Sequence, residues 1–320
     1  MAAVDAGPAP LGSIARVDRW LLSAAPPERL GVLRLVIGSY GLANFVVSVG
    51  EFRRLASRSG SQFEPVGIAG LLDGPVPAGA LWALYALSLV TGAAFLAGAA
   101  YRISGPAFAL CTLAWATYHS SWGQMLHFEH LLTLHLLVLG FSPAVDALSV
   151  DARRRSSPAP IRSVRYGWPV RLLAIITVVT YALAGLAKIR VSGWAWVDGT
   201  TLANHIAHAT TRLDLLGEPR PPLATTVISQ QWLIQPMALA SLAIEVLAPL
   251  ALFRRFRRLW VVGVVLFHVG TLATMFVFFA YNGLGIALLP LYRVERAAEW
   301  LRRRGQRPVN HSDGSTSLED

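Results

Sequence analysis

The sequence predicts an all-α, polytopic integral membrane protein, a helical bundle of about eight transmembrane helices. Hydrophobic residues make up 54% of the 320 residues, and charged residues only 14%. Because a soluble domain usually carries about 25% charged residues, an ordinary soluble fold is excluded. Several apolar segments reach the roughly 20 residues that a helix needs to cross a bilayer. The net charge of +10 then fits basic loops beside a membrane better than a nucleic-acid partner.

The predicted spans follow one another along most of the chain. They cover residues 30–50, 78–101, 106–120, 125–141, 168–187, 236–253, 259–280 and 283–291. The last apolar run is divided at Asn282 and Gly283, because this pair favours a turn. Residues 11–24 place apolar side chains on one face and arginines on the other, which predicts a helix lying in the membrane interface. We expect a cytoplasmic segment at 1–29, a transmembrane domain at 30–293 and a polar cytoplasmic tail at 294–320.

The distribution of arginine predicts the orientation of the bundle. Arginines concentrate on the cytoplasmic side of membrane proteins. If the N-terminus is inside, the dense clusters at 153–155, 254–258 and 302–304 are also inside, and the main exception is 53–58. The sequence therefore predicts N-in and C-in. The single cysteine, Cys111, excludes an intrachain disulfide and a cysteine-rich metal site.

One lysine, Lys188, stands among 28 basic residues, at the outer end of the fifth predicted span. One interpretation is a terminal cation whose side chain reaches the interface. Arginine would serve that purpose equally well, and it occupies the other 27 basic positions. Lysine can lose its proton when it is buried, whereas arginine effectively cannot. This difference favours a catalytic base at Lys188.

Among the ionisable residues within predicted spans, three are further candidates for the site, because such groups usually have a function. Glu129 and His130 lie near the outer end of the fourth span, at the predicted depth of Lys188, and the alternative is a polar cap on the span. Glu245 lies mid-span. One interpretation is that Glu245 belongs to a functional site. The other is structural: Glu245 forms a hydrogen bond to another span or an ion pair with Arg34 of the first span.

Residues 188–235 form an outer stretch too long for a plain connector. The candidates to line a site there are Trp194, Trp196, Asp198, Asn204 and His205. An aromatic belt at the membrane interface is the alternative. His127, His130, His205 and His208 could together form a four-histidine metal site, but HxxH spacing alone is weak, and we predict no metal. His268 could be a haem ligand, but a histidine packed in the core is the preferred interpretation.

Two motifs carry a family resemblance. The fourth span and its exit contain Glu129-His130 followed by Ser142-Pro143, Asp146, Ser149 and Asp151, and the fifth span ends in Ala184-Gly185-x-x-Lys188 before 196–199. The sequence around them, from about residue 31 to 293, resembles the horizontally transferred transmembrane (HTTM) domain family, which includes the vitamin K-dependent gamma-carboxylases. Gly31 to Arg34 and Glu245 to Pro249 fit more loosely.

The resemblance implies a bundle of about eight helices with its site on the extracytoplasmic face. It implies that Lys188 deprotonates a reduced vitamin K of the menaquinol type, and that His130, beside Glu129, stabilises developing charge. Oxygen then generates a strong base that removes a glutamate proton, and carbon dioxide adds. Two departures are that 196–199 lie further from Lys188 than in the animal enzyme, and that the lumenal substrate-binding portion of that enzyme has no counterpart in these 320 residues.

These observations favour quinol-linked modification, carboxylation-like or other, of a secreted peptide at the outer face of a bacterial cytoplasmic membrane. The expected partners are the lipid bilayer and this peptide, and no nucleic acid. The first alternative is a non-enzymatic maturation, export or immunity partner in which Lys188 only pairs with a carboxylate. The second is a small-solute transporter that uses Arg34, Glu129 and Glu245.

Overall fold

The computed structural model is mainly helical in the residues that it describes, which are 13–124, 129–155, 161–297 and 299. Within these ranges it contains no β-strand, and one isolated bridge joins Ala25 to Ser163. The all-α fold class is therefore confirmed. Of the predicted tail at 294–320, residue 298 and residues 300–320 lie outside the described residues.

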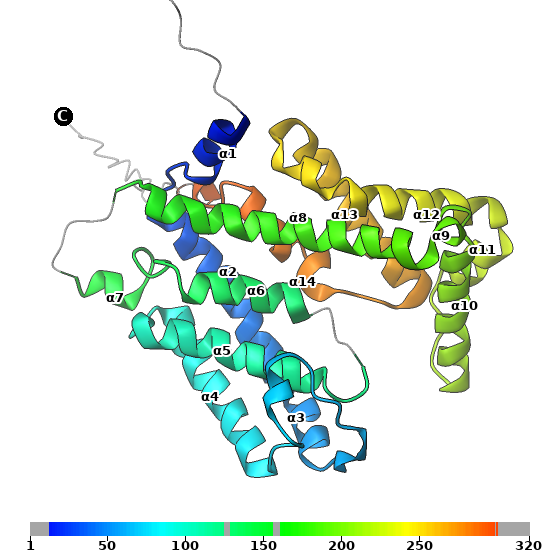
Figure 1. Ribbon diagram of the computed structural model, residues 1–320, viewed down its shortest axis with the longest axis horizontal. Helices are drawn as coiled ribbons and strands as arrows, with labels where there is room; N and C mark the ends of the chain where they lie inside the picture. Colours follow the sequence, from blue (N-terminus) through cyan, green and yellow to red (C-terminus); the bar gives the residue numbers. More distant parts are fainter. Residues whose placement is uncertain (1–12, 125–128, 156–160, 298, 300–320) are drawn as a thin grey trace, which may run out of the picture.

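The helices succeed one another as follows (Figure 1): α1 Ser13–Leu21, α2 Pro27–Val47, α3 Val49–Ala56, η1 Gly60–Gln62, η2 Gly67–Leu71, α4 Ala78–Ala97, α5 Tyr101–His119, α6 His130–Gly140, α7 Val150–Arg153, α8 Val164–Ser192, α9 Trp194–Val197, α10 Thr200–Leu215, α11 Ala224–Ser229, α12 Gln231–Val246, η4 Ala248–Leu252, α13 Arg254–Met275, α14 Ala280–Gly283 and η5 Ile286–Leu291. The interfacial helix expected at 11–24 corresponds to α1. The outer stretch at 188–235 is largely helical, because α9, α10 and α11 lie in it.

Four of the helices are long and apolar enough to cross a membrane: α2, α4, α8 and α13. They coincide with four of the predicted spans. The other four predicted spans fall on α5, α6, α12 and the pair α14 and η5, which do not combine that length with that hydropathy. The number of about eight crossings and the N-in, C-in orientation therefore stay predictions.

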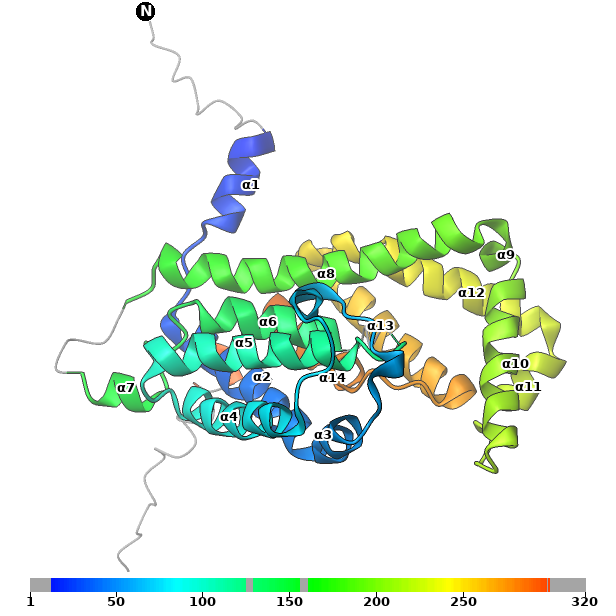
Figure 2. The same ribbon diagram turned by 60° about the horizontal axis from the view of Figure 1, so that its bottom comes forward.

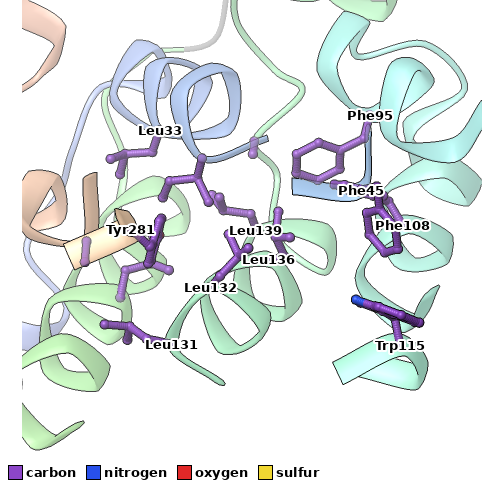
Figure 3. Close-up of a cluster of buried hydrophobic side chains, with 14 of the residues drawn as sticks. Leu33, Phe45, Phe95, Phe108, Trp115, Leu131, Leu132, Leu136, Leu139 and Tyr281 are labelled. Carbon is purple, nitrogen blue, oxygen red and sulfur yellow. The ribbon is translucent and has the colours of Figure 1, made fainter. Parts of the chain in front are cut away.

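The main core is built around α6, whose leucines reach several neighbouring helices at once. Figure 3 shows Leu131, Leu132, Leu136 and Leu139 of α6 grouped near Tyr281 of α14. All of these side chains are buried, and α2, α5 and α8 also contact α6. Such burial explains why most of the 11 residues of α6 are leucine or another apolar residue.

Arg34 of α2 joins three segments by hydrogen bonds to backbone carbonyls. Its guanidinium is fully buried and donates to the carbonyls of Phe95 and Leu96 at 2.6 Å each, of Leu148 at 2.6 Å and of Ala144 at 3.2 Å. The last carbonyls of a helix have no partner within the helix, and five N–H donors suit them. The predicted alternative of an ion pair between Arg34 and Glu245 is wrong, and Arg34 does not support the transporter alternative.

Arginines from distant parts of the chain gather at one end of the bundle. Arg29 at the start of α2 donates to both carboxylate oxygens of Glu295, at 2.5 and 2.8 Å, so the start and the end of the described chain meet. Arg171 near the start of α8 lies within electrostatic range of Arg29, Arg162, Arg257 and Arg293. Figure 2 shows α1 and α7 near this end, and α9, α10 and α11 at the other. Arg29, Arg162, Arg171, Arg257 and Arg293 thus mark an arginine-rich end of the structure.

Candidate functional site

Lys188 and Glu245 form an ion pair between α8 and α12, far from the arginine-rich end. The Nζ atom of Lys188 lies 2.5 Å from Oε1 of Glu245. The side chain of Glu245 is 5% exposed and that of Lys188 is 20% exposed. A buried carboxylate must be paired or protonated, and here its partner is the single lysine.

Gly185 explains why the two helices come close enough for this pair. A Cβ atom at position 185 would lie 2.9 Å from Cβ of Glu245 and 2.9 Å from the backbone nitrogen of Val246. Only a glycine leaves room for α12 at this crossing. Lys188 lies three residues further along α8, on the same face. The Gly-x-x-Lys spacing therefore places the ammonium beside the carboxylate.

Replacing Gly185 with alanine should destabilise the protein by about 1–3 kcal/mol, because the added methyl group forces α8 and α12 apart. A lower thermal unfolding midpoint of the purified protein in detergent is the expected result. Gly270→Ala on α13 is the matched control, since its Cβ would meet nothing within 4 Å and alanine favours a helix. If both variants melt at the wild-type temperature, the close crossing at Gly185 is not a constraint on the fold.

Two aromatic rings hold the ammonium group from other directions. Nζ of Lys188 lies 4.6 Å from the ring centroid of Trp196 and 5.4 Å from that of Phe267, which is the geometry of cation–π contacts. Trp196 is itself fixed, because its Nε1 donates to the carbonyl of Ala238 at 3.2 Å. The charge of Lys188 is thus held by one carboxylate and two ring faces.

These residues border a cavity of about 420 Å³, a size typical of small-molecule sites. Its walls are mainly apolar and aromatic, with Leu131, Ala184, Leu202, Phe267, Met275, Val277 and Phe279 among them. Its polar groups include Lys188, Glu245, His205, Tyr181, His268 and Asn282. The cavity therefore suits a flat, mostly apolar ligand that has a few polar atoms.

Three of these polar groups form a buried relay. Asn282 Nδ2 donates to the Tyr181 hydroxyl at 2.9 Å, and that hydroxyl lies 2.8 Å from Nε2 of His268. The hydroxyl accepts from Asn282 and keeps its own proton, and in the tautomer of a neutral His268 whose Nε2 accepts that proton, Nδ1 carries the ring proton.

Two buried polar atoms on residues that line the cavity have no hydrogen-bond partner among the residues described: His268 Nδ1 and Glu245 Oε2. Nδ1 is a donor in the tautomer whose Nε2 accepts from Tyr181, and Oε2 of an ionised carboxylate is an acceptor. Buried polar atoms are nearly always paired in native proteins. Both unpaired atoms are themselves buried, on two residues that line the cavity.

The sequence placed His268 in the core and did not select Tyr181 or Asn282 as site residues. Tyr181, Ala184 and Lys188 are separated by three and four residues, which puts them on one face of α8. That periodicity, read backward from Lys188, is the signal that could have found Tyr181. Asn282 joins the site only through the fold, because the turn after α13 returns it to α8.

Glu129 and His130 belong to different surroundings from Lys188. Glu129 is buried, and its Oε1 lies 3.4 Å from Nδ1 of His119, whose Nε2 lies 3.6 Å from Glu51. His130 is exposed, and neither residue lines the cavity, although the following residue, Leu131, does. The structure therefore does not bring these two residues together with Lys188 around this cavity, and their predicted roles stay untested.

The other predicted lining residues divide between the cavity and the surface. Trp196 and His205 line the cavity, whereas Trp194 is 77% exposed, and Asp198 and Asn204 are also exposed. Asp198 accepts a hydrogen bond from the backbone of Thr200 at 2.8 Å, which lowers its pKa and caps α10. Within the described ranges no group of three His, Cys, Asp or Glu side chains could hold a metal ion, and His127 lies outside those ranges.

A family model for the HTTM domain matches residues 23–295, which is most of the chain. The chain belongs to the HTTM domain family. The resemblance drawn from the sequence is thereby confirmed, and the chain is a membrane protein related to the gamma-carboxylase family. No curated protein and no solved structure matches this HTTM protein.

Proposed function

We propose that this HTTM protein is a membrane enzyme in which Lys188 takes a proton from a reduced quinone of the menaquinol type. In this proposal the reaction is coupled to modification of a secreted peptide. The observation that carries it is the Lys188–Glu245 pair at the edge of an aromatic cavity. An amine beside a hydrophobic cavity is a group that can act as a general base.

The residues present fit such a ligand. A reduced quinone is a flat aromatic ring with hydroxyl groups on opposite sides. The aromatic walls suit the ring, and Lys188, Glu245 and His268 are polar side chains of the same lining that can serve its oxygens. A mainly aromatic wall with a few polar groups supports the assignment of a quinol to the cavity.

The chemistry of Lys188 follows from its pairing with Glu245. In the ion pair the ammonium holds the proton, and its transfer to the carboxylate leaves a neutral amine beside a neutral carboxyl group. In a low-dielectric site, burial costs less free energy for this neutral pair than for two charged groups. The amine then accepts a hydroxyl proton from the ligand and becomes an ammonium ion again, beside the new oxyanion. Trp196 and Phe267 hold that ammonium in place.

A bound reduced quinone would supply electrons for a reaction with oxygen, and carbon dioxide would be consumed if the peptide step is a carboxylation. The contribution of this chain lies in binding and orienting the ring, holding one proton at Lys188 and one at Glu245, and keeping water out with the apolar walls.

A second candidate function is a non-enzymatic membrane partner for a secreted peptide. The observation that favours it is the same 2.5 Å pair, because a buried salt bridge can be purely structural. In that case arginine at position 188 would be tolerated, since it also pairs with carboxylates.

A substitution that fills the cavity and leaves its polar groups unchanged tests the proposal. Ala184→Trp places an indole into the cavity wall, so quinol-dependent oxygen uptake by protein in lipid nanodiscs should fall at least about tenfold. Leu183→Trp is the matched control: the neighbouring residue is 59% exposed and does not line the cavity. No uptake by the wild type, or equal loss in both variants, would contradict the proposal.

A further inference from the structure

A second cavity, of about 840 Å³, lies at the arginine-rich end of the bundle. It is bordered by the start of α5, the end of α6, α7 and the start of α8. Arg165, on its border, is 23 residues before Lys188 along α8, which corresponds to about 35 Å of helix. This cavity is therefore separate from the site of the proposed quinol chemistry and does not depend on it.

The charged groups of this cavity leave an excess of positive charge. Four arginines and two aspartates line it, so its formal charge is +2: Arg102, Arg154, Arg155 and Arg165 with Asp146 and Asp151. An excess of arginine in a concave site favours an anionic ligand, and guanidinium groups match phosphate oxygens well.

Both aspartates are already engaged by the protein. Asp146 is buried, accepts a hydrogen bond from the Tyr166 hydroxyl at 2.8 Å, and pairs with Arg155 at 2.7 Å and Arg165 at 3.4 Å. Asp151 accepts from the backbone nitrogens of Ala100 at 3.1 Å and Tyr101 at 2.9 Å, and so caps α5.

Arg102 and Arg154 carry the unbalanced charge. Both side chains are exposed, and within the described ranges neither forms an ion pair. The two aspartates that could neutralise Arg102 and Arg154 are Asp146 and Asp151, and both are already engaged by other groups of the protein. These two guanidinium groups are therefore the ones available to an incoming anion.

The other wall of the cavity is apolar and open. Ile103 is 75% exposed and Phe141 is 63% exposed, and Pro106 and Val145 lie with them on the border. Ile103 follows Arg102 directly, in the first turn of α5, whereas Phe141 follows the last residue of α6. A soluble phosphate compound would leave these side chains in water. A lipid would cover them with its acyl chain.

We propose that this cavity is a binding site for an anionic phospholipid, with its phosphate on Arg102 and Arg154 and the start of an acyl chain on Ile103 and Phe141. Basic pockets between membrane helices recognise the head groups of such lipids. The position fits, because the cavity lies where the helices α5, α6 and α8 begin or end at the arginine-rich side.

The test measures retained lipid by native mass spectrometry of the purified chain, titrated with phosphatidylglycerol or phosphatidylcholine. The wild type should bind phosphatidylglycerol more tightly than phosphatidylcholine. The double variant Arg102→Gln/Arg154→Gln should weaken phosphatidylglycerol binding roughly 10- to 30-fold, since each arginine near an anionic surface contributes about a factor of five. Neither substitution touches the pairs of Asp146, so the fold should persist.

The matched control is Arg254→Gln/Arg255→Gln, which removes the same charge at the start of α13, away from the cavity. It should change phosphatidylglycerol binding less than about threefold. Equal losses in the two double variants would indicate general surface attraction and overturn the proposal. Displacement of the lipid by millimolar inorganic phosphate would identify a soluble-anion site and would also overturn it.

Discussion

Lys188→Arg should abolish quinol-dependent turnover, although it preserves a cation that can pair with Glu245. A general base contributes about 10²- to 10⁴-fold to a rate, and arginine effectively never loses its proton. Lys188→Ala should be equally inactive, because it also leaves no base. The measurement is oxygen uptake and epoxide formation with reduced menaquinone, for both variants and the wild type in nanodiscs.

The comparison between the two substitutions separates the two candidate functions. Arg190→Lys is a control for the general effect of a basic exchange near the end of α8, since Arg190 is exposed. Inactivity of Lys188→Ala is expected under either candidate function, because this substitution leaves Glu245 buried without its partner. An active Lys188→Arg variant would refute the base and leave the structural pair as the function of Lys188.

Arg34→Met should cause the largest loss of stability among the changes considered. The guanidinium is fully buried and donates to four backbone carbonyls. Methionine of similar length leaves those carbonyls without a partner, at a cost of more than about 3 kcal/mol. A substantial fall in the thermal unfolding midpoint, or failure to accumulate in the membrane, is the expected result.

Arg34→Lys should recover only part of this stability, because three N–H donors on a single atom cannot replace a planar guanidinium that reaches four oxygens. Arg258→Met is the control, since Arg258 is exposed near the start of α13. The account of Arg34 as the joint between α2, α4 and the segment after α6 would be wrong if Arg34→Met and Arg258→Met melted at the same temperature.

The sequence predicts the helical fold well, because apolar runs of membrane length have few alternative structures. It located α2, α4, α8 and α13 within a few residues. The number of membrane crossings is harder to predict from the sequence. A short apolar segment such as α6 owes its position to neighbours that bury most of its side chains, and residue periodicity does not reveal those neighbours.

For the candidate site, the sequence selected Lys188 because it is one lysine among 28 basic residues, and the structure places it on the lining of a cavity. It left the partner of Glu245 open, because the answer depends on where α12 crosses α8. That crossing is set by Gly185, and its role becomes visible only when the Cβ position is compared with the opposite helix.

His130 and Glu129 illustrate the converse limit. Their predicted depth matched that of Lys188, but depth does not specify the direction in which a side chain points. Glu129 turns toward His119 of α5, whereas Leu131 reaches the cavity. Residues that are adjacent in a helix point about 100° apart, so a neighbour of a lining residue is often directed elsewhere.

The central claim is that Lys188 takes a proton from an aromatic hydroxyl in the cavity. Anaerobic ultraviolet difference spectroscopy tests it directly, with a naphthol analogue of the quinol that cannot be oxidised to a quinone. Binding to the wild type should produce the red-shifted band of the naphtholate, and binding to Lys188→Arg should leave the naphthol unionised. A naphtholate band in both proteins, or an unionised naphthol bound to the wild type, would contradict this account.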